Sequence, residues 1–560
     1  MKSLKLMFVA VTAIVFLLLG LIWPVEAKTL PKERRIEKIS VLTTTAAYDL
    51  VRYEMGRTIA EAWKKLGVNA SLEAIDYKAG IQRTLRSKRF DTFIIHWGAK
   101  PERIDPDVFL YHALHSSNAG ETGWNITGFQ NPEYDELVEA QRKEMDIQKR
   151  QKLVWKAQEV YFEHQPHNIL INEDLFFAYN KKTFKDPILA VGNPITNFWS
   201  DISFTPITEQ KYLRQGYPAD LKVSNPLALA TLEGHYVMRH VYDSLIRIGW
   251  DGEPKPWAAE SFKIVDNVTV DITLRDGMKW HDGKPVTVED VKFSFDYLKE
   301  WKAAYYLSFL EPLDSVEILD SKRVRFRLKY PFAPFILNTL GQIYLIPRHI
   351  WANLTDREAI KDPNFYENPH PIGSGPFKWG YWKKGEMVKL DAFREHFHPP
   401  KADGFMFVVY GSKDAMVGGF EKGEIDVTGF YLRPHHVRRL EQAGFAEFPP
   451  SANFGFYNIH YNCRKPPFND MIFRRALSMA IPHKEILETI FEGKGVLTGT
   501  MICPPNKFWH NPNIPPFPED SVKARETLKR AGYEWDDEGN IYYPAPENDR
   551  RKIDIFPVKK

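Results

Sequence analysis

The sequence predicts an α/β protein with more than one domain, and three observations lead to this expectation. Segments with helical apolar spacing alternate with β-rich segments, which is the order of elements in α/β folds. The 560 residues are enough for about three domains' worth of core. Aromatic residues make up 14% of the chain, including 15 Trp, which suits large apolar cores and stacking surfaces for a ligand.

The first 27 residues resemble a cleaved secretory signal. Lys2 and Lys5 precede an apolar run over residues 6–22, and a Val-x-Ala pattern ends at Ala27. A retained membrane anchor is the alternative, because a run of about 17 residues is at the lower limit for a membrane span. We expect cleavage, which places the mature protein in the periplasm or outside the cell.

Charge and cysteine content narrow the classes of partner. The formal charge is +3, and acidic and basic residues are interleaved, so nothing indicates nucleic-acid binding. The only cysteines, Cys463 and Cys503, exclude a lipid-modified cysteine behind the apolar run; they could form a disulfide or remain free. We expect a monomer without a cofactor.

The helices and strands of the front part follow from local signals. Residues 51–66 have helical apolar spacing and Gly67 ends the helix, after which "VNASLEAID" reads as a strand. Asn131 and Pro132 provide a cap and a first helical residue for the next helix, and another helix ends before Pro166. The proline-rich region over residues 183–226 shows no period.

The later helices and strands also follow from local sequence signals. "NVTVDITL" and "RVRFRLKY" alternate like half-buried strands, and they flank a helix that begins with a capping box of Thr287 and Asp290. "DMIFRRALSMAI" is a helix ended by Pro482, and "SVKARETLKRAGY" is the last clear helix.

Enzyme motifs do not occur. The chain has no nucleophile elbow, zinc-protease motif, phosphate loop or CxxC pair, and "GSGPF" at residues 373–377 lacks the lysine and helix of a phosphate loop. The pairs His396/His398 and His435/His436 could ligate a metal, but isolated pairs are more often surface or core residues. We therefore expect no catalytic residue and no metal site.

One long stretch carries a family resemblance. "PWAAESFKIVDNVTVDITLRDGMKWHDGKPVTVEDVKFSFDYL", residues 256–298, resembles the signature of the bacterial extracellular solute-binding proteins of family 5, the peptide and oligosaccharide receptors of ABC importers. Further similar segments follow the family's order: "VYDSLIRIG" (241–249), "PIGSGPFKWGYWKKGE" (371–386, with Ser374 and Phe377 departing from the family's loop), "KGEIDV" (422–427), "YNIHYNCRKPPFNDMIFRRALSMAI" (457–481) and "ARETLKRAGY" (524–533).

The order of segments departs from the family at one place. Segments resembling the family's carboxy-terminal part, over residues 56–166, precede everything else, so the chain resembles a circularly permuted member. "RRIEKISVL" (34–42) and "RRKIDIFPV" (550–558) are similar, either as a relic of tandem duplication or by chance.

The resemblance implies a fold of two α/β lobes that close on a solute about a hinge. In this chain it implies a signal peptide over 1–27, the first part of the second lobe over 28–170, the first lobe over 171–450 with a subdomain at about 255–370, and the rest of the second lobe over 451–560.

The resemblance also implies ligand-binding positions in the second lobe. Peptide receptors of the family have an Asp three residues after a Trp, and the Asp pairs with the ammonium of the peptide. Here Trp97 is followed by Lys100, which would repel an ammonium, unless Lys100 points to solvent. Because the loop is about two residues longer than the family pattern, Glu102 or Asp105 could swing in instead.

Other contacts are expected across the cleft. Glu233 and His235 lie in a segment, "LATLEGHYVMRH", where family members contact ligand, and Tyr457 and Asn458 lie on the strand that re-enters the second lobe.

The leading expectation is a receptor that delivers an oligopeptide-like or oligosaccharide-like solute to an ABC permease in the inner membrane. A secreted carboxylate-dependent hydrolase and a periplasmic sensor or chaperone remain alternatives.

Overall fold

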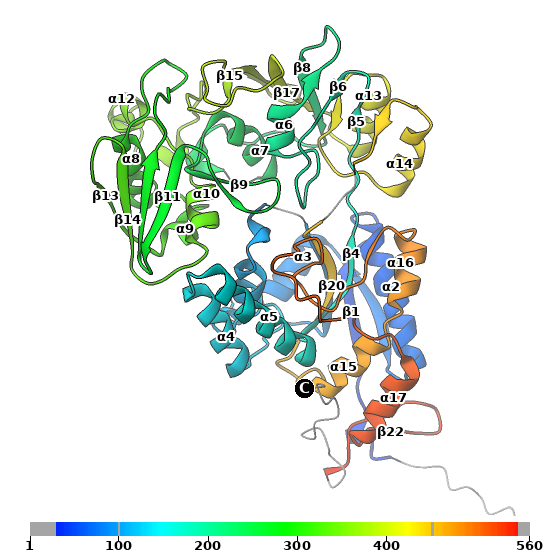
Figure 1. Cartoon of the computed structure of the whole chain (residues 1–560). Helices are drawn as coiled ribbons and strands as arrows, with labels where there is room; N and C mark the ends of the chain where they lie inside the picture. The colour runs from blue at the N-terminus through cyan, green and yellow to red at the C-terminus, as the bar shows by residue number, and fades with distance from the viewer. Residues whose placement is uncertain (1–29, 99–100, 122, 230, 450–452, 547–560) are drawn as a thin grey trace, which may run out of the picture.

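The computed structural model describes residues 30–546 except 99–100, 122, 230 and 450–452, so the expected signal sequence and the second of the two similar segments lie outside the described residues. The chain forms two α/β lobes, which lie above and below one another in Figure 1. Within the described ranges, no helix has the length and apolar character needed to span a membrane.

The second lobe is built on one mixed sheet of six strands. The order across the sheet is β2 (Ala70–Ile75), β1 (Ile39–Thr44), β3 (Thr92–Trp97), β20 (Phe456–Tyr461), β4 (His167–Glu173) and β21 (Gly495–Val496). β1 is parallel to β2 and β3, whereas β20 is antiparallel to both of its neighbours, β3 and β4. Strands from the front and the back of the chain therefore share one sheet.

Both faces of this sheet are covered, because consecutive residues of its strands are apolar and point to opposite faces. Val41 and Ile94 face one core, and Leu42 and Phe93 face another. The helices around the sheet are α2 (Leu50–Lys65), α3 (Tyr77–Ile81), α4 (Pro132–Lys143), α5 (Ile147–His164), α15 (Met471–Met479), α16 (His483–Ile490) and α17 (Ser521–Arg530).

The first lobe contains two larger sheets. The seven-stranded sheet has the order β15 (Phe377–Lys383), β16 (Met387–Ala392), β17 (Gly404–Val409), β8 (Tyr212–Tyr217), β18 (Val427–Thr428), β5 (Tyr179–Asn180) and β19 (Ala446–Glu447). The four-stranded antiparallel sheet has the order β11 (Ala259–Asp266), β12 (Thr269–Leu274), β14 (Arg323–Leu328) and β13 (Leu313–Ile318).

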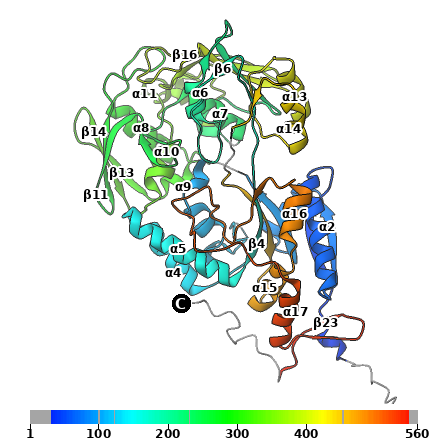
Figure 2. The same cartoon turned by 45° about the vertical axis from the view of Figure 1, so that its right-hand side comes forward.

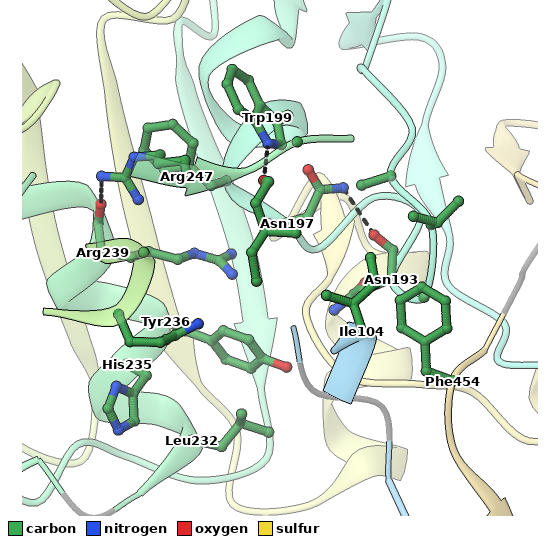
Figure 3. A pocket seen from close by; sticks show the side chains of 18 of the residues that line it. Ile104, Asn193, Asn197, Trp199, Leu232, His235, Tyr236, Arg239, Arg247 and Phe454 are labelled. Carbon is green, nitrogen blue, oxygen red and sulfur yellow. Dashed lines mark hydrogen bonds between the residues drawn. The ribbon is translucent and has the colours of Figure 1, made fainter. Parts of the chain in front are cut away.

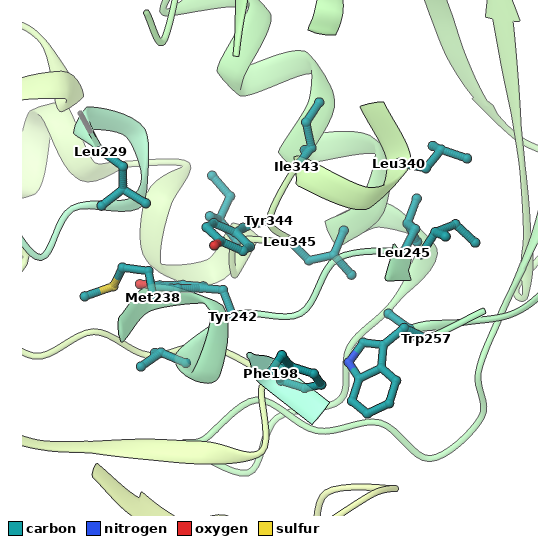
Figure 4. Close-up of a cluster of buried hydrophobic side chains, with 14 of the residues drawn as sticks. Phe198, Leu229, Met238, Tyr242, Leu245, Trp257, Leu340, Ile343, Tyr344 and Leu345 are labelled. Carbon is teal, nitrogen blue, oxygen red and sulfur yellow. The ribbon is translucent and has the colours of Figure 1, made fainter. Parts of the chain in front are cut away.

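The helices of the first lobe pack on these sheets around a large apolar core, part of which is drawn in Figure 4. They are α6 (Phe198–Ser203), α7 (Leu232–Val241), α8 (Val288–Glu300), α9 (Leu307–Leu310), α10 (Leu340–Gln342), α11 (Arg348–Trp351), α12 (Leu354–Arg357), α13 (Lys413–Glu421) and α14 (Pro434–Glu441).

Short pairs and single turns complete the fold. The two-stranded pairs are β10 (Pro254–Pro256) with β9 (Ile246–Ile248), β22 (Glu534–Trp535) with β23 (Ile541–Tyr542), and β6 (Phe184–Lys185) with β7 (Thr205–Pro206). The single turns are η1 (Lys32–Arg34), η2 (Gln82–Arg86), η3 (Pro101–Ile104), η4 (Val108–His112), η5 (Ser116–Asn118), η6 (Pro226–Ala228), η7 (Phe335–Thr339) and η8 (Pro363–Phe365).

The local sequence signals are confirmed. Asn131 caps α4 with Pro132 at its first position, and Thr287 and Asp290 form the capping box of α8. Gly67 follows α2 with φ +93°, a left-handed conformation that glycine adopts without strain. Cys463 and Cys503 are both free thiols, which decides between the two alternatives left open by the sequence.

Two crossovers connect the lobes. The chain passes from β4 to β5 after Glu173, and it returns between β19 and β20. Both views place the first of these connections between the lobes, on the side of α14 and α16 (Figures 1 and 2). α4 and the four-stranded sheet lie on the side away from the crossovers.

The described ends of the chain lie side by side in the second lobe. Ile36 N donates to Ile541 O at 3.1 Å, and Tyr543 N donates to Arg34 O at 2.7 Å. In addition, Arg34 forms an ion pair with Glu534 at 2.5 Å.

Candidate ligand pocket between the lobes

A cavity of about 150 Å³ lies where the lobes meet (Figure 3). Most of its wall belongs to the first lobe, from residues 190–199, from α7 and the segment behind it, and from the turn around α10. Two residues come from the other side: Ile104 at the end of η3, and Phe454 just before β20. The cavity is therefore an interlobe pocket with one dominant wall.

Aromatic side chains form much of the first-lobe wall. Trp199 and Tyr236 are 7% and 8% exposed, so they keep only an edge open to the cavity. The indole nitrogen of Trp199 donates to Ile248 O at 2.8 Å, which holds the ring in place. Such rings offer flat apolar surface to a sugar ring or an apolar side chain.

The charged groups of the wall are the guanidinium groups of Arg239 and Arg247, which Figure 3 labels beside Tyr236 and Trp199. Arg239 Nη2 donates to Asp201 Oδ2 at 2.9 Å and to Thr196 O at 3.1 Å. The guanidinium of Arg247 lies 3.6 Å from the centre of the Phe198 ring. Burial lowers the pKa of Arg247 to about 10, which still leaves it charged at neutral pH.

Asp201 is the counter-charge that positions Arg239. Its carboxylate is fully buried, and it also accepts hydrogen bonds from Gln215 Nε2 and from His240 Nε2, the latter at 2.9 Å. Burial lowers the pKa of His240, so the ring is neutral and donates to Asp201 through Nε2–H. This network fixes the arginine before any solute arrives.

Each arginine also has one buried nitrogen without a hydrogen-bond partner. Among the described residues, the Nε–H groups of Arg239 and Arg247 have no hydrogen-bond acceptor. A buried donor without an acceptor costs free energy. Both Nε atoms have almost no exposed surface, so a solute in the cavity would reach only the other nitrogens of the two guanidinium groups.

The second lobe contributes a cap. Ile104 is 3% exposed and its Cδ1 packs against Gly252, where an added Cβ would clash with it. Gly252 also has φ +89°, so glycine is required there on two grounds. Asn506 Nδ2 donates to Ile104 O at 2.8 Å and thereby ties η3 to its own lobe.

The ligand contacts expected at the end of β3 and in the loop after it are not among the residues that line the cavity or are not described. Trp97 is 8% exposed and packs edge-on against Phe109, with ring centres 5.7 Å apart, inside the second lobe. It is not among the residues that line the described cavity. Lys100 lies outside the described residues, and of Glu102 only the backbone in η3 is described.

Asp105 is a structural residue. Its carboxylate is fully buried and receives two hydrogen bonds from the Arg150 guanidinium, at 2.7 and 2.9 Å. An interior ion pair with this geometry leaves no free oxygen for a solute. The structure therefore does not bring Asp105 to the cavity.

Of the pair expected on α7, only one lines the cavity. His235 is a lining residue, and its ring centre lies 4.2 Å from that of Tyr305. Glu233, in the first turn of the same helix, is half-buried and is not among the lining residues.

The pair expected on β20 is buried within the second lobe. Tyr457 stacks on His96 with ring centres 4.3 Å apart, and burial raises the pKa of its phenol. Asn458 Nδ2 is 3.1 Å from His460 Nε2 and has no exposed surface. Neither residue lines the cavity.

Sequence reasoning missed Arg239, Tyr236, Trp199 and Ile104. α7 offered a usable signal, because residues 232, 235, 236 and 239 recur at helical spacing and all line the cavity. No local signal pointed to Trp199 or Ile104, which reach the pocket through tertiary contacts.

Comparison with known proteins now gives a family. Residues 253–556 match the sequence model of bacterial extracellular solute-binding proteins, family 5 Middle. The oligopeptide-binding protein AppA of Bacillus subtilis (strain 168) is 29% identical over 286 residues, which are 49% of this chain and 51% of that protein. A dipeptide-binding protein of Escherichia coli (strain K12) is 27% identical over 301 residues, or 50% and 55% of the two chains.

Solved structures give partial matches. The ABC transporter substrate-binding protein CtaP from Listeria monocytogenes is 25% identical, with a TM-score of 0.47 over 58% of this chain and 66% of the other. AppA in complex with a nonapeptide is 24% identical, with a TM-score of 0.42 over 57% and 64%. The chain spans about half the length of the curated relatives that it matches. Because the family model covers more than half of its residues, the chain belongs to the bacterial extracellular solute-binding proteins of family 5.

Proposed function

We propose that this protein is a periplasmic receptor that binds a solute between its lobes and delivers it to an ABC permease in the inner membrane. The observation that carries the proposal is the interlobe pocket, in which aromatic rings and guanidinium groups on one lobe face an apolar cap of Ile104 and Phe454 on the other. Binding sites of this kind need shape and a few polar groups, and no nucleophile.

The proposed solute is oligopeptide-like or oligosaccharide-like, and neutral or acidic. Arg239 and Arg247 line the pocket, and no Asp or Glu side chain is among the described lining residues. A free ammonium would therefore meet cations, whereas a carboxylate or a hydroxyl-rich ring would find donors. The presence of Lys100 where the family's peptide receptors have Asp agrees with this preference.

Size limits how much of the solute the pocket holds. Its volume of about 150 Å³ is below the roughly 300–1,000 Å³ of common ligand pockets. One residue or one sugar unit fits while Ile104 remains in place. A longer solute requires the second-lobe face to withdraw, as hinge opening would allow.

Delivery of a solute depends on how much more tightly the solute binds the closed state than the open state. A solute shifts the lobes toward the closed state only if it binds that state more tightly. Here Ile104 completes the wall only when the lobes meet, so closure adds contacts that the open form lacks. The proposed role in the periplasm also rests on the signal-like start of the sequence.

We also propose that the chain is a circular permutant, with lobe boundaries near residues 28–170, 171–450 and 451–560. Support comes from β20, which lies between β3 and β4, and from Trp63 Nε1 of α2, which donates to Leu477 O of α15 at 3.0 Å. The adjacent chain ends add to this, because permutation at such a site changes connectivity and keeps packed contacts.

The alternatives make different demands on the molecule. A hydrolase with two carboxylates would need an acidic pair in the pocket, and the described lining residues include none. A sensor or chaperone would bind solute in the same way but pass the signal to a protein other than a permease.

Isothermal titration against matched solutes tests the proposal. The set comprises tri- to pentapeptides with free or acetylated amino termini, neutral oligosaccharides, and oligosaccharides with a uronic acid. We expect micromolar binding, about −8 kcal/mol, for an acetylated peptide or a sugar. Tight binding only of peptides with free amino termini would contradict the solute class, and turnover of any bound solute would favour the hydrolase.

A further inference from the structure

The lobes also touch outside the pocket, on the side away from the crossovers. There the last turn of α4 meets the loop between β14 and η7, which belongs to the small sheet of the first lobe (Figures 1 and 2). Ala333 N donates to Arg142 O at 2.7 Å. The guanidinium of Arg142 lies 5.1 Å from the centre of the Phe332 ring.

The second lobe holds Arg142 ready for this contact. Its Nε is 3.0 Å from Asp107 Oδ1, and its guanidinium lies 3.6 Å from the centre of the Tyr111 ring. Asp107 is 1% exposed and also accepts from Gln141 Nε2 at 2.9 Å. A planar guanidinium fixed between a carboxylate and an aromatic ring has already lost most of its rotamer freedom, so docking Phe332 costs little more entropy.

The anchor of Arg142 and the cap of the pocket belong to one short segment. Ile104, Asp107 and Tyr111 lie within eight residues, and the pairing of Asp105 with Arg150 fixes that segment to α5. The segment therefore presents Ile104 to the pocket and Asp107 to Arg142 at the same time. Contact at one site favours contact at the other.

We propose that Arg142 is a positioning residue that latches the two lobes together and sets the affinity for solute without touching it. The latch consists of Arg142 on α4 and of Phe332 and Ala333 on the opposing loop. Hinge opening breaks the contact, because it joins parts of the lobes that lie away from the crossovers. The closed fraction, and with it the residence time of a solute, then depends on this contact.

A second interlobe contact provides a matched control. Arg438 on α14 forms an ion pair with Glu492 of the second lobe. This pair lies close to a crossover, because Lys494, two residues after Glu492, accepts a backbone hydrogen bond from Asp174 there. Both side chains of this pair are about half exposed, at 58% and 46%. An exposed ion pair beside the crossovers moves little on opening and contributes little.

The test measures lobe separation without solute, so it decides the latch independently of the proposed receptor role. Spin labels at the exposed positions Gln148 and Ser321, in a Cys463→Ser, Cys503→Ala background, report the distance between α5 and the β13–β14 turn. The variants are Arg142→Gln; Ala333→Pro, which removes the N–H donor; Ala333→Gly, which keeps it; and Arg438→Gln.

We expect mostly short label-to-label distances in the labelled parent protein. In Arg142→Gln and Ala333→Pro the population with long distances should grow, and the open-to-closed ratio should rise by about fivefold. Ala333→Gly and Arg438→Gln should change the ratio less than twofold and keep the melting temperature of the parent. Arg142→Gln also leaves the buried Asp107 without its arginine and should melt earlier, so its distances are measured well below its melting temperature. Unchanged distances in both latch variants would overturn the proposal, as would a parent protein with only the long distance. A misfolded Ala333→Pro leaves the decision to Arg142→Gln.

Discussion

The two faces of the pocket are built differently. The first-lobe face carries the polar groups, and its Asp201 network sets Arg239 before a solute arrives. The second-lobe face offers Ile104, and its own buried ion pair, Asp105 with Arg150, is used to hold the segment in place. The difference teaches that the polar groups of the pocket are concentrated in one lobe, and that the other lobe supplies apolar contact.

Removing the counter-charge of the first-lobe face should have the largest effect. Asp201→Asn keeps the shape but leaves Arg239 without its carboxylate, and breaking a buried pair costs about 3–5 kcal/mol. We expect this loss in urea unfolding, together with loss of solute binding. The control is Asp271→Asn, which breaks a pair with Arg325 on the half-buried surface of the small sheet. Equal stability of the two variants would contradict the assignment of Asp201 as the buried counter-charge of Arg239.

Acid should weaken the second lobe more than the first. Burial lowers the pKa of His460 to about 3 and of His483 to about 4, and both belong to the second lobe. Each folded-state pKa is below the unfolded value of about 6.5, so the unfolded chain binds protons first as pH falls. Stability contributed by the neutral rings is full above pH 6.5 and is lost between about 6.5 and 4.

The loss amounts to roughly 3 kcal/mol for a group such as His483. At pH 5 about 2 kcal/mol of this is already lost, and hydrogen exchange at pH 7.5 and 5 measures that part lobe by lobe. The amides of β20 should lose more protection than those of β17. The first lobe also has buried neutral histidines, including His281 with a pKa of about 4, so its protection should fall too, but by less. Earlier loss in β17 would reverse the comparison.

Replacing Arg239 should have the next largest effect, a loss of affinity for solute. Arg239→Gln removes a charged donor from the first-lobe face, and hydrogen bonds to charged groups contribute about 1.5–3 kcal/mol. We expect the affinity for an acidic solute to fall by at least tenfold in calorimetry, with a smaller loss for its neutral counterpart. Arg325→Gln, which removes an arginine paired with Asp271 away from the pocket, is the control. Equal losses for both solutes would remove the acidic preference.

The smallest of these effects belongs to the cap. Ile104→Ala removes apolar surface that packs against Gly252 of the other lobe, and at about 0.8 kcal/mol per methylene the loss is about 2 kcal/mol. The dissociation rate of a solute should rise by up to about thirtyfold, the equivalent of about 2 kcal/mol, while the melting temperature stays near that of the parent. Ile147→Ala, at an exposed position of the same lobe, should change neither quantity. A solute-free protein that melts much earlier would show that Ile104 serves the core.

Local elements could be predicted from the sequence, because caps and periodicity lie within a few residues. Asn131, Thr287 and Gly67 each act on the helix next to them, and each was identified correctly. The sequence also points to the α7 segment with Glu233 and His235, and of these two only His235 lines the cavity. Counting by helical turns from His235 leads to 239 and away from 233.

The remaining differences depend on contacts that are distant in sequence. Trp97 was expected to form a platform for the ligand, but Phe109 occupies its edge inside the second lobe. The sequence near Asp105 shows no partner for its carboxylate, because Arg150 is 45 residues away and meets it only in the folded chain. Tyr457 and Asn458 alternate along β20, yet this strand is central in its sheet, so both faces are buried.

The central claim is that the second lobe closes on a solute held by the first. Small-angle scattering of the unmutated protein, with and without a saturating amount of the tightest-binding solute from the titration set, tests it most directly. The account predicts a smaller radius of gyration with solute, because binding favours the closed state. An identical radius of gyration at saturation, with binding verified in the same sample, would contradict it.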